Sequence, residues 1–172
     1  MERLWTFDRL AVTMRRVDFL DPAMTGQPDA RERGVRVEIK PAQTQARGSV
    51  YASDVVTLEQ ALCRCDFLES GSGKADRMHW HPEMAHGEPG GRTFEAGMPA
   101  DPRGWLISFL RSGLPDYLSR SGHDITSYTD DLTEVVLAFV MVVQKSMIQT
   151  KCSASVPRRV PGESSDPAVG SS

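Results

Sequence analysis

Residues 58–82 read LEQALCRCDFLESGSGKADRMHWHP, and this stretch decides the expected fold. Its first part, Ala61 to Leu68, alternates side chains between two faces, as a β-strand does. A turn rich in Ser and Gly occupies residues 69–75, and a second strand from Asp76 to His81 stops at Pro82. We therefore expect an antiparallel hairpin in which the second strand pairs with the first.

Two registers of this hairpin remain open. In the first, Cys65 lies opposite His79 and Cys63 lies opposite His81, which brings together two thiolates and two imidazoles, the ligands that structural zinc prefers. In the register shifted by one residue, Asp66 lies opposite His79, and both cysteines turn to the other face of the sheet. The single residue between the cysteines is shorter than the spacing in zinc fingers.

Three of the four histidines of the chain fall within residues 79–86. On a strand, His79 and His81 point to the same face, where two neutral imidazoles can bind one metal ion. His86 could join them from the loop that follows. The pattern indicates a candidate site for a divalent metal such as zinc. The alternative is that these histidines only hydrogen-bond to carbonyls or carboxylates, and the sequence leaves both alternatives open.

Five short motifs carry a resemblance to a known family. They are Gly48-Ser49, Arg64-x-Asp66-Phe-Leu68, Asp76-Arg-x-His79-x-His81-Pro82, Gly87-Glu88-Pro89-x-x-Arg92-x-Phe94 and Asp101-Pro-x-Gly-Trp105-Leu106. Over residues 35–118 they resemble an uncharacterised family of small actinobacterial proteins, whose pattern has the Asp-Arg and His-x-His-Pro residues but not the two cysteines. The family has no established activity, so the resemblance implies no catalytic residues. It implies one polar cluster with the two histidines, in which the ligand-binding residues are Asp66, Arg77, Glu88 and Arg92.

The composition limits the class of protein. A chain of 172 residues with a net charge of −3 predicts one domain and no strong attraction to nucleic acid or to an anionic membrane. The cysteines are odd in number, and the charged N-terminal residues leave no room for the apolar run of a signal peptide. The longest apolar run, residues 135–143, is shorter than the roughly 20 residues of a membrane span. We therefore expect a cytoplasmic protein.

Further strands are expected at residues 9–20, 35–39, 48–51 and 92–94. A change of phase in the alternation of residues 9–20 predicts a bulge near Arg15–Arg16. Pro41 is expected to end the strand at residues 35–39.

Helices are expected in the C-terminal part of the chain. Asp101-Pro102 has the residue types of a helix start, and Gly113 is a candidate C-cap. This helix carries an apolar stripe made of Trp105, Leu106, Phe109 and Leu110. A second short helix is expected from Pro115 to Gly122.

The last helix is expected over residues 132–150, because Asp131 and Glu134 have the spacing of a capping box. Its run of residues 135–143 is apolar on all sides, which predicts that it is either buried within one chain or forms a homodimer.

This order of elements predicts an α+β fold, with an antiparallel sheet from the N-terminal two-thirds and two or three C-terminal helices packed on it. One domain is expected over residues 1–150, followed by a disordered tail over residues 151–172. Two functions remain open. The polar cluster belongs to a binding module or a metal-dependent enzyme, or the chain is a non-enzymatic structural or interaction domain whose histidines only hydrogen-bond.

Overall fold

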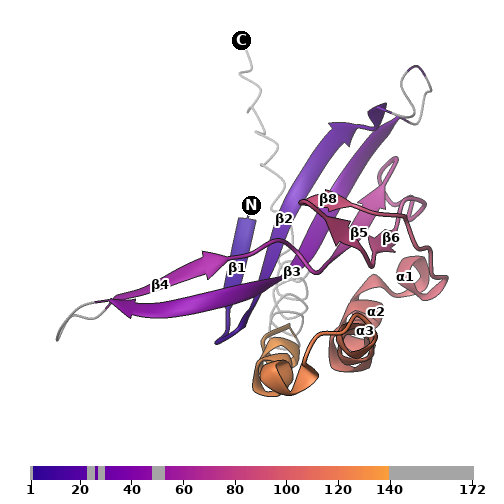
Figure 1. Ribbon diagram of the computed structural model, residues 1–172. Helices are drawn as coiled ribbons and strands as arrows, with labels where there is room; N and C mark the ends of the chain where they lie inside the picture. The colour runs from indigo at the N-terminus through magenta and orange to yellow at the C-terminus, as the bar shows by residue number, and fades with distance from the viewer. Residues whose placement is uncertain (1, 23–25, 27–29, 48–52, 140–172) are drawn as a thin grey trace, which may run out of the picture.

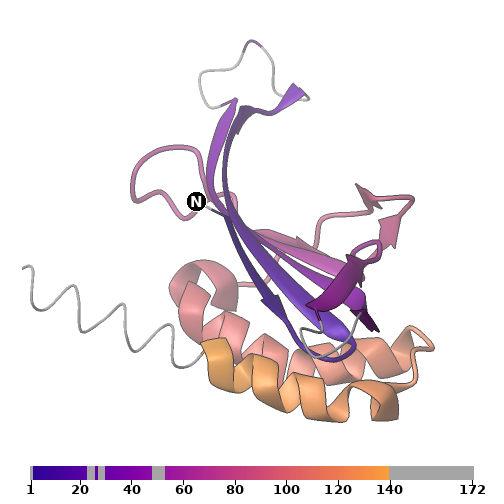
Figure 2. The ribbon, with the colours of Figure 1, turned by 90° about the vertical axis from the view of Figure 1, so that its left-hand side faces the viewer.

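An antiparallel sheet forms the body of the protein, and helices cover one of its faces (Figures 1 and 2). The computed structural model describes residues 2–22, 26, 30–47 and 53–139. The strands are β1 (Glu2–Thr6), β2 (Leu10–Leu20), β3 (Arg31–Arg47), β4 (Ser53–Leu58), β5 (Cys63–Glu69) and β6 (His79–His81), in the spatial order β1-β2-β3-β5-β6, with β4 paired to β3. The strands β7 (Met84–Ala85) and β8 (Glu88–Pro89) form a separate hairpin. The α+β fold expected from the sequence is confirmed.

The helices follow the sheet in the sequence. They are α1 (Gly97–Ala100), α2 (Pro102–Ser108) and α3 (Leu114–Arg120), and a final helix runs from residue 129 to the last described residue, 139. Asp101 caps α2 as predicted, since its carboxylate accepts the N–H of Gly104 at 3.0 Å. Gly113 is not a C-cap, because a π-helical turn over Phe109–Gly113 joins α2 to α3 without a break. The chain turns instead at Gly122, whose φ is 77°.

The hydrophobic core lies between the helices and one face of the sheet. Strands β3, β5 and β6 give this face Val37, Ile39, Cys63, Cys65 and Trp80, and the helices supply Phe109, Leu110, Leu114, Leu118 and Val135. Alternate residues of the same strands must point to the opposite face. None of the described helices lies on that face, which is called the helix-free face below, and it carries the polar residues of the candidate site.

Two sequence predictions about β2 and β3 are wrong. The pairing of these strands is uninterrupted from Leu10–Pro41 to Leu20–Arg31, so no bulge exists near Arg15–Arg16. The phase of the alternation changes there because only the first residues of β2 are buried. Pro41 does not end β3. It lies between the residues of β3 that pair with β5 and those that pair with β4, so its missing N–H breaks neither pairing. Its carbonyl accepts the N–H of Glu59 at 2.9 Å.

The predicted capping box at the last helix is also wrong. The helix already begins at residue 129, so Asp131 lies inside its first turn. The Asp131 carboxylate instead accepts the backbone N–H groups of Arg9 and Leu10, both at 2.6 Å. It therefore fixes the start of β2 to the helix layer.

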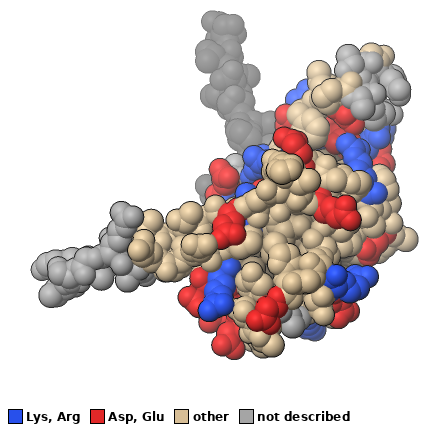
Figure 3. Space-filling view, in the orientation of Figure 1, with Lys and Arg blue, Asp and Glu red and all other residues tan. Residues whose placement is uncertain are grey.

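Some predictions lie outside the described residues: the strand at 48–51, residues 140–150 of the last helix, and the tail. Among the described residues, no helix is long and apolar enough to cross a membrane. Acidic and basic side chains are interspersed on the face that Figure 3 shows, in keeping with the small net charge.

Candidate functional site

The register between β5 and β6 decides which side chains meet. Asp66 lies opposite His79, and Arg64 lies opposite His81. This is the second of the two registers that the sequence allows, and it confirms that both histidines share one face of a strand paired with β5. The prediction of a two-Cys, two-His zinc site is wrong, because Cys63 and Cys65 are fully buried on the helix-covered face.

A third segment lies on the other side of β6. Trp80 and Thr93 exchange both backbone hydrogen bonds, at 2.9 and 2.8 Å, and form an isolated β-bridge in place of the short strand expected at residues 92–94. In an antiparallel pair of this register, Phe94 is the neighbour of His79 and Arg92 is the neighbour of His81. The rings of Phe94 and His79 are 5.5 Å apart. Three adjacent segments therefore place their polar side chains on the helix-free face.

The two imidazoles and the carboxylate of Asp66 converge on one point. Nε2 of His79 lies 3.1 Å from Nε2 of His81, and Oδ2 of Asp66 lies 3.6 and 3.8 Å from these two nitrogens. The point equidistant from three atoms so separated lies about 2 Å from each, which is the usual distance from zinc to imidazole nitrogen or carboxylate oxygen. All three residues are buried, and they are the group among the described residues that could hold a metal ion.

The outer nitrogens of both rings have backbone partners. Nδ1 of His79 lies 2.9 Å from the carbonyl oxygen of Arg77, and Nδ1 of His81 lies 2.9 Å from that of Gly90. Since a carbonyl only accepts, each Nδ1 carries a proton and donates it. This arrangement fixes the tautomer that leaves Nε2 free as a ligand, as in metal-binding histidines.

The number of protons adds a further constraint. Three contacts, the two Nδ1–carbonyl pairs and the Nε2–Nε2 pair, each need one proton, but two neutral imidazoles carry only two. Burial lowers the pKa of His79 and of His81, and the positive charge of Arg92 acts in the same direction on both. The rings are therefore neutral near pH 7, and two lone pairs face each other at 3.1 Å.

Charged side chains of β3 surround the cluster. Arg36 forms a two-pronged contact with Asp66, at 2.7 and 3.1 Å, and both side chains are largely buried. In the next row, Glu38 pairs with Arg64 at 3.0 Å and with Lys40 at 3.2 Å. The carboxylate of the cluster is thus held in a fixed position by a guanidinium group.

Arg92 joins the site to the far ends of β2 and β3. Its guanidinium lies 3.4 Å from Asp21 and 3.4 Å from Glu32, two buried carboxylates. Burial raises the pKa of Glu32, and the charges of Arg92 and Arg77 oppose that rise. Since Glu32 lies well along β3 from the row of His81, β3 must bend over the helix-free face, and Figure 2 shows this curvature.

Gly34 lies on this strand between Glu32 and Arg36. Its φ is 151°, and an added Cβ would lie 2.1 Å from the carbonyl oxygen of Phe67 on β5. Glycine is required there because no larger residue fits so close to the neighbouring strand.

The predicted site residues are only partly brought together. His79, His81 and Asp66 meet, Arg77 contributes its backbone carbonyl, and Arg92 borders the site. Two predicted residues do not join the cluster: His86 and Glu88. His86 lies exposed at the tip of the β7–β8 hairpin with a φ of 52°, next to Gly87 at 84°. Both central residues of this two-residue turn have positive φ, as the type I′ geometry requires.

Three residues of the site were not predicted from the sequence: Asp21, Glu32 and Arg36. The partner of Asp66 is Arg36, and Arg92 contacts Glu32 on β3 and Asp21, the residue that follows β2. The alternation of Arg36 and Glu38 with apolar residues was a usable signal, since it places both on the polar face.

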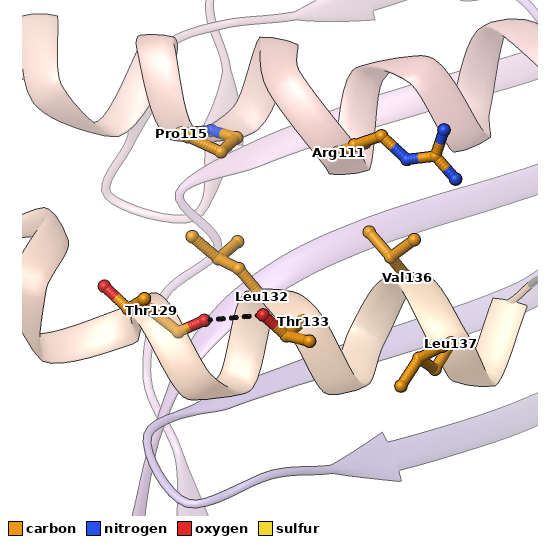
Figure 4. A pocket seen from close by; sticks show the side chains of 7 residues that line it. All are labelled: Arg111, Pro115, Thr129, Leu132, Thr133, Val136 and Leu137. Atoms are coloured by element: carbon orange, nitrogen blue, oxygen red, sulfur yellow. Dashed lines mark hydrogen bonds between the residues drawn. The ribbon is translucent and has the colours of Figure 1, made fainter.

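A groove of about 370 Å³ lies elsewhere, between α3 and helix 129–139. Figure 4 shows Leu132 and Val136 directed toward the helix that carries Arg111 and Pro115. Its lining is mostly apolar and carries no titratable cluster, so it is separate from the histidine site.

Fold and site together define an α+β protein with a buried cluster of two histidines and one aspartate on the helix-free face of its sheet. No protein-family model, no curated protein and no solved structure matches the chain. The functional argument therefore depends on the geometry of the site.

Proposed function

We propose that the protein binds one divalent transition-metal ion through Nε2 of His79, Nε2 of His81 and Oδ2 of Asp66. The observation that carries this proposal is the convergence of these three atoms around a point about 2 Å from each. The shortage of one proton between the two neutral rings supports it, because a cation removes the repulsion between their lone pairs. The backbone carbonyls behind both rings support it as well.

The ligand set favours zinc or ferrous iron. Two imidazoles and one carboxylate bind zinc in hydrolytic enzymes and bind iron in oxygenases. Both kinds of site keep at least one coordination position for water or substrate, whereas structural zinc sites use four protein ligands. A metal-dependent enzyme is therefore the kind of protein that this cluster favours.

Metal content tests the proposal directly. Protein purified without an affinity tag is analysed by inductively coupled plasma mass spectrometry, and metal-free protein is then titrated with Zn²⁺ in a calorimeter. We expect one ion per chain. His79→Ala and His81→Ala each weaken binding by more than about 100-fold, since loss of a ligand costs more than loss of a residue that only orients one.

His86→Ala is the matched control, because His86 is exposed and lies outside the cluster. It should leave stoichiometry and affinity unchanged. The proposal is wrong if wild-type protein binds no zinc or iron at micromolar concentration, or if the control variant weakens binding as much as the two ligand variants do.

One observation favours a structural alternative. Asp66 is already compensated by Arg36, so the buried carboxylate does not need a metal to balance its charge. In that case the cluster only fixes β5 to β6, and the protein is a non-enzymatic domain. Thermal unfolding with and without a chelator separates the two: a bound metal stabilises the fold by mass action, whereas a purely hydrogen-bonded cluster gives the same melting temperature in both buffers.

A further inference from the structure

The proposed metal site is incomplete as a coordination sphere. In the part of the chain that the structure describes, the cluster contains one carboxylate and two imidazoles and no fourth ligating side chain. Zinc takes four ligands or more, and iron in such a triad keeps open positions. At least one position is therefore left for a ligand that these residues do not supply.

Arg92 borders this position. By the register of the Trp80–Thr93 bridge it is the cross-strand neighbour of His81, and its charge acts on both imidazoles. Its contacts with Asp21 and Glu32, both at 3.4 Å, are at the outer limit of hydrogen bonding, and its side chain is 39% exposed. The guanidinium of Arg36, in contrast, holds Asp66 through two shorter hydrogen bonds, at 2.7 and 3.1 Å. Arg92 can therefore gain short, charge-assisted hydrogen bonds from a further anion.

The local charge favours a negative ligand. The charged side chains around the cluster already balance one another: Asp66 pairs with Arg36, Glu38 with Arg64 and Lys40, and Asp21 and Glu32 with Arg92. A divalent ion adds two positive charges, and no further carboxylate of the cluster neutralises them. The ligand must also be small, because Phe94 lies against His79 and the three ligand residues are buried.

We propose that the metal-loaded site binds a small oxyanion, one oxygen of which coordinates the metal while Arg92 donates hydrogen bonds to the others. This inference rests on the proposed metal site. Carboxylate and phosphate share the required chemistry, since both present several acceptor oxygens to a guanidinium fork.

Cobalt(II) serves as a spectroscopic probe of the site, because its visible absorption changes with its coordination sphere. The cobalt-loaded protein is titrated separately with sodium acetate and with inorganic phosphate. We expect a saturable spectral change with at least one of them, and the anion that saturates at lower concentration identifies the class. Arg92→Gln should weaken that anion by at least about 10-fold, the loss of a charge-assisted hydrogen bond, while the variant still binds one cobalt ion per chain.

Two further variants make the result specific. Arg103→Gln removes an exposed arginine of α2 and should leave anion binding unchanged. Because Arg92→Gln leaves Glu32 buried without its counter-ion, the double variant Arg92→Gln/Glu32→Gln keeps the test available if the single variant unfolds.

The outcomes distinguish this inference from the metal site itself. If cobalt binds one to one but neither anion changes its spectrum, the oxyanion proposal is wrong and the metal site stands. If an anion binds Arg92→Gln as tightly as wild type, the assigned role of Arg92 is wrong. If cobalt does not bind, both proposals are wrong.

Discussion

The contact between Asp66 and Arg36 offers a quantitative test of how the helix-free face is stabilised. Asp66→Asn keeps the shape of the side chain and removes its charge, leaving the Arg36 guanidinium without a carboxylate. The side chains of the pair are only 2% and 15% exposed. Removing one partner of a buried ion pair costs about 3–5 kcal/mol, a large share of the roughly 5–15 kcal/mol that stabilises a typical domain.

The chain contains a matched control. Asp18 and Arg31 form the same two-pronged contact between neighbouring strands, at 2.7 and 2.8 Å, but their side chains are 49% and 60% exposed. Because water screens an exposed pair and solvates the partner that remains, Asp18→Asn should change stability little. The two variants thus differ in burial and not in the geometry of the contact.

Urea unfolding at pH 7.5 in the presence of a chelator measures both variants without a contribution from bound metal. We expect a large decrease of the midpoint for Asp66→Asn, with an unchanged dependence of the free energy on urea. Adding Arg36→Met to Asp66→Asn should recover part of the loss, since it removes the uncompensated buried charge. Equal losses for Asp66→Asn and Asp18→Asn would refute the argument that burial gives the pair its importance.

Three other predictions follow from the structure. Burial lowers the pKa of His79 and His81, so on acidification the unfolded chain takes up protons before the folded chain does. The metal-free protein should therefore keep its full free energy of unfolding above pH 6.5 and lose up to about 3 kcal/mol per pH unit below it. A urea midpoint that stays constant between pH 7.5 and 5.5 would contradict this prediction. Gly34→Ala should destabilise the fold strongly, because the added methyl group collides with the backbone of Phe67, whereas a melting temperature equal to wild type would mean that β3 can shift. A homodimer through the helix expected over residues 132–150 stays a prediction. Leu137 is 60% exposed, and the variant Leu137→Glu should be a monomer in sedimentation equilibrium. A wild-type protein that is already monomeric would exclude the dimer.

The hairpin of β5 and β6 could be predicted from the sequence, but its register was left open although a signal for it existed. Cys65 belongs to the apolar side of β5, and in the observed register it lies opposite Trp80. Matching the apolar side of one strand with the apolar side of the next places the cysteine and Trp80 together against the helices. It leaves Asp66 and the histidines on the polar face. Since a shift of one residue exchanges the two faces, this rule distinguishes the two registers that the sequence left open.

The remaining parts of the site depend on curvature, which local patterns do not encode. Arg92 meets Asp21 and Glu32, which lie 71 and 60 residues away in the sequence, only because β3 bends over the helix-free face. The role of Asp131 was missed for a similar reason. Its carboxylate accepts backbone N–H groups at the start of β2, more than 120 residues away in the sequence. Residue types alone do not predict such a contact.

The burial of charged side chains on the helix-free face indicates a functional role, because burying charge is energetically unfavourable. Five charged residues there, Asp21, Glu32, Glu38, Arg64 and Asp66, are buried together with two histidines. Replacing buried ion pairs by apolar side chains of similar volume is often neutral or stabilising, and the other face of the same strands shows that this chain can build an apolar layer. Glu32 also retains an oxygen, Oε2, without a hydrogen-bond partner among the described residues. Buried charge that a fold does not need for stability is expected where a protein binds a ligand or performs chemistry. The convergence of the histidines with Asp66 identifies the centre of that region.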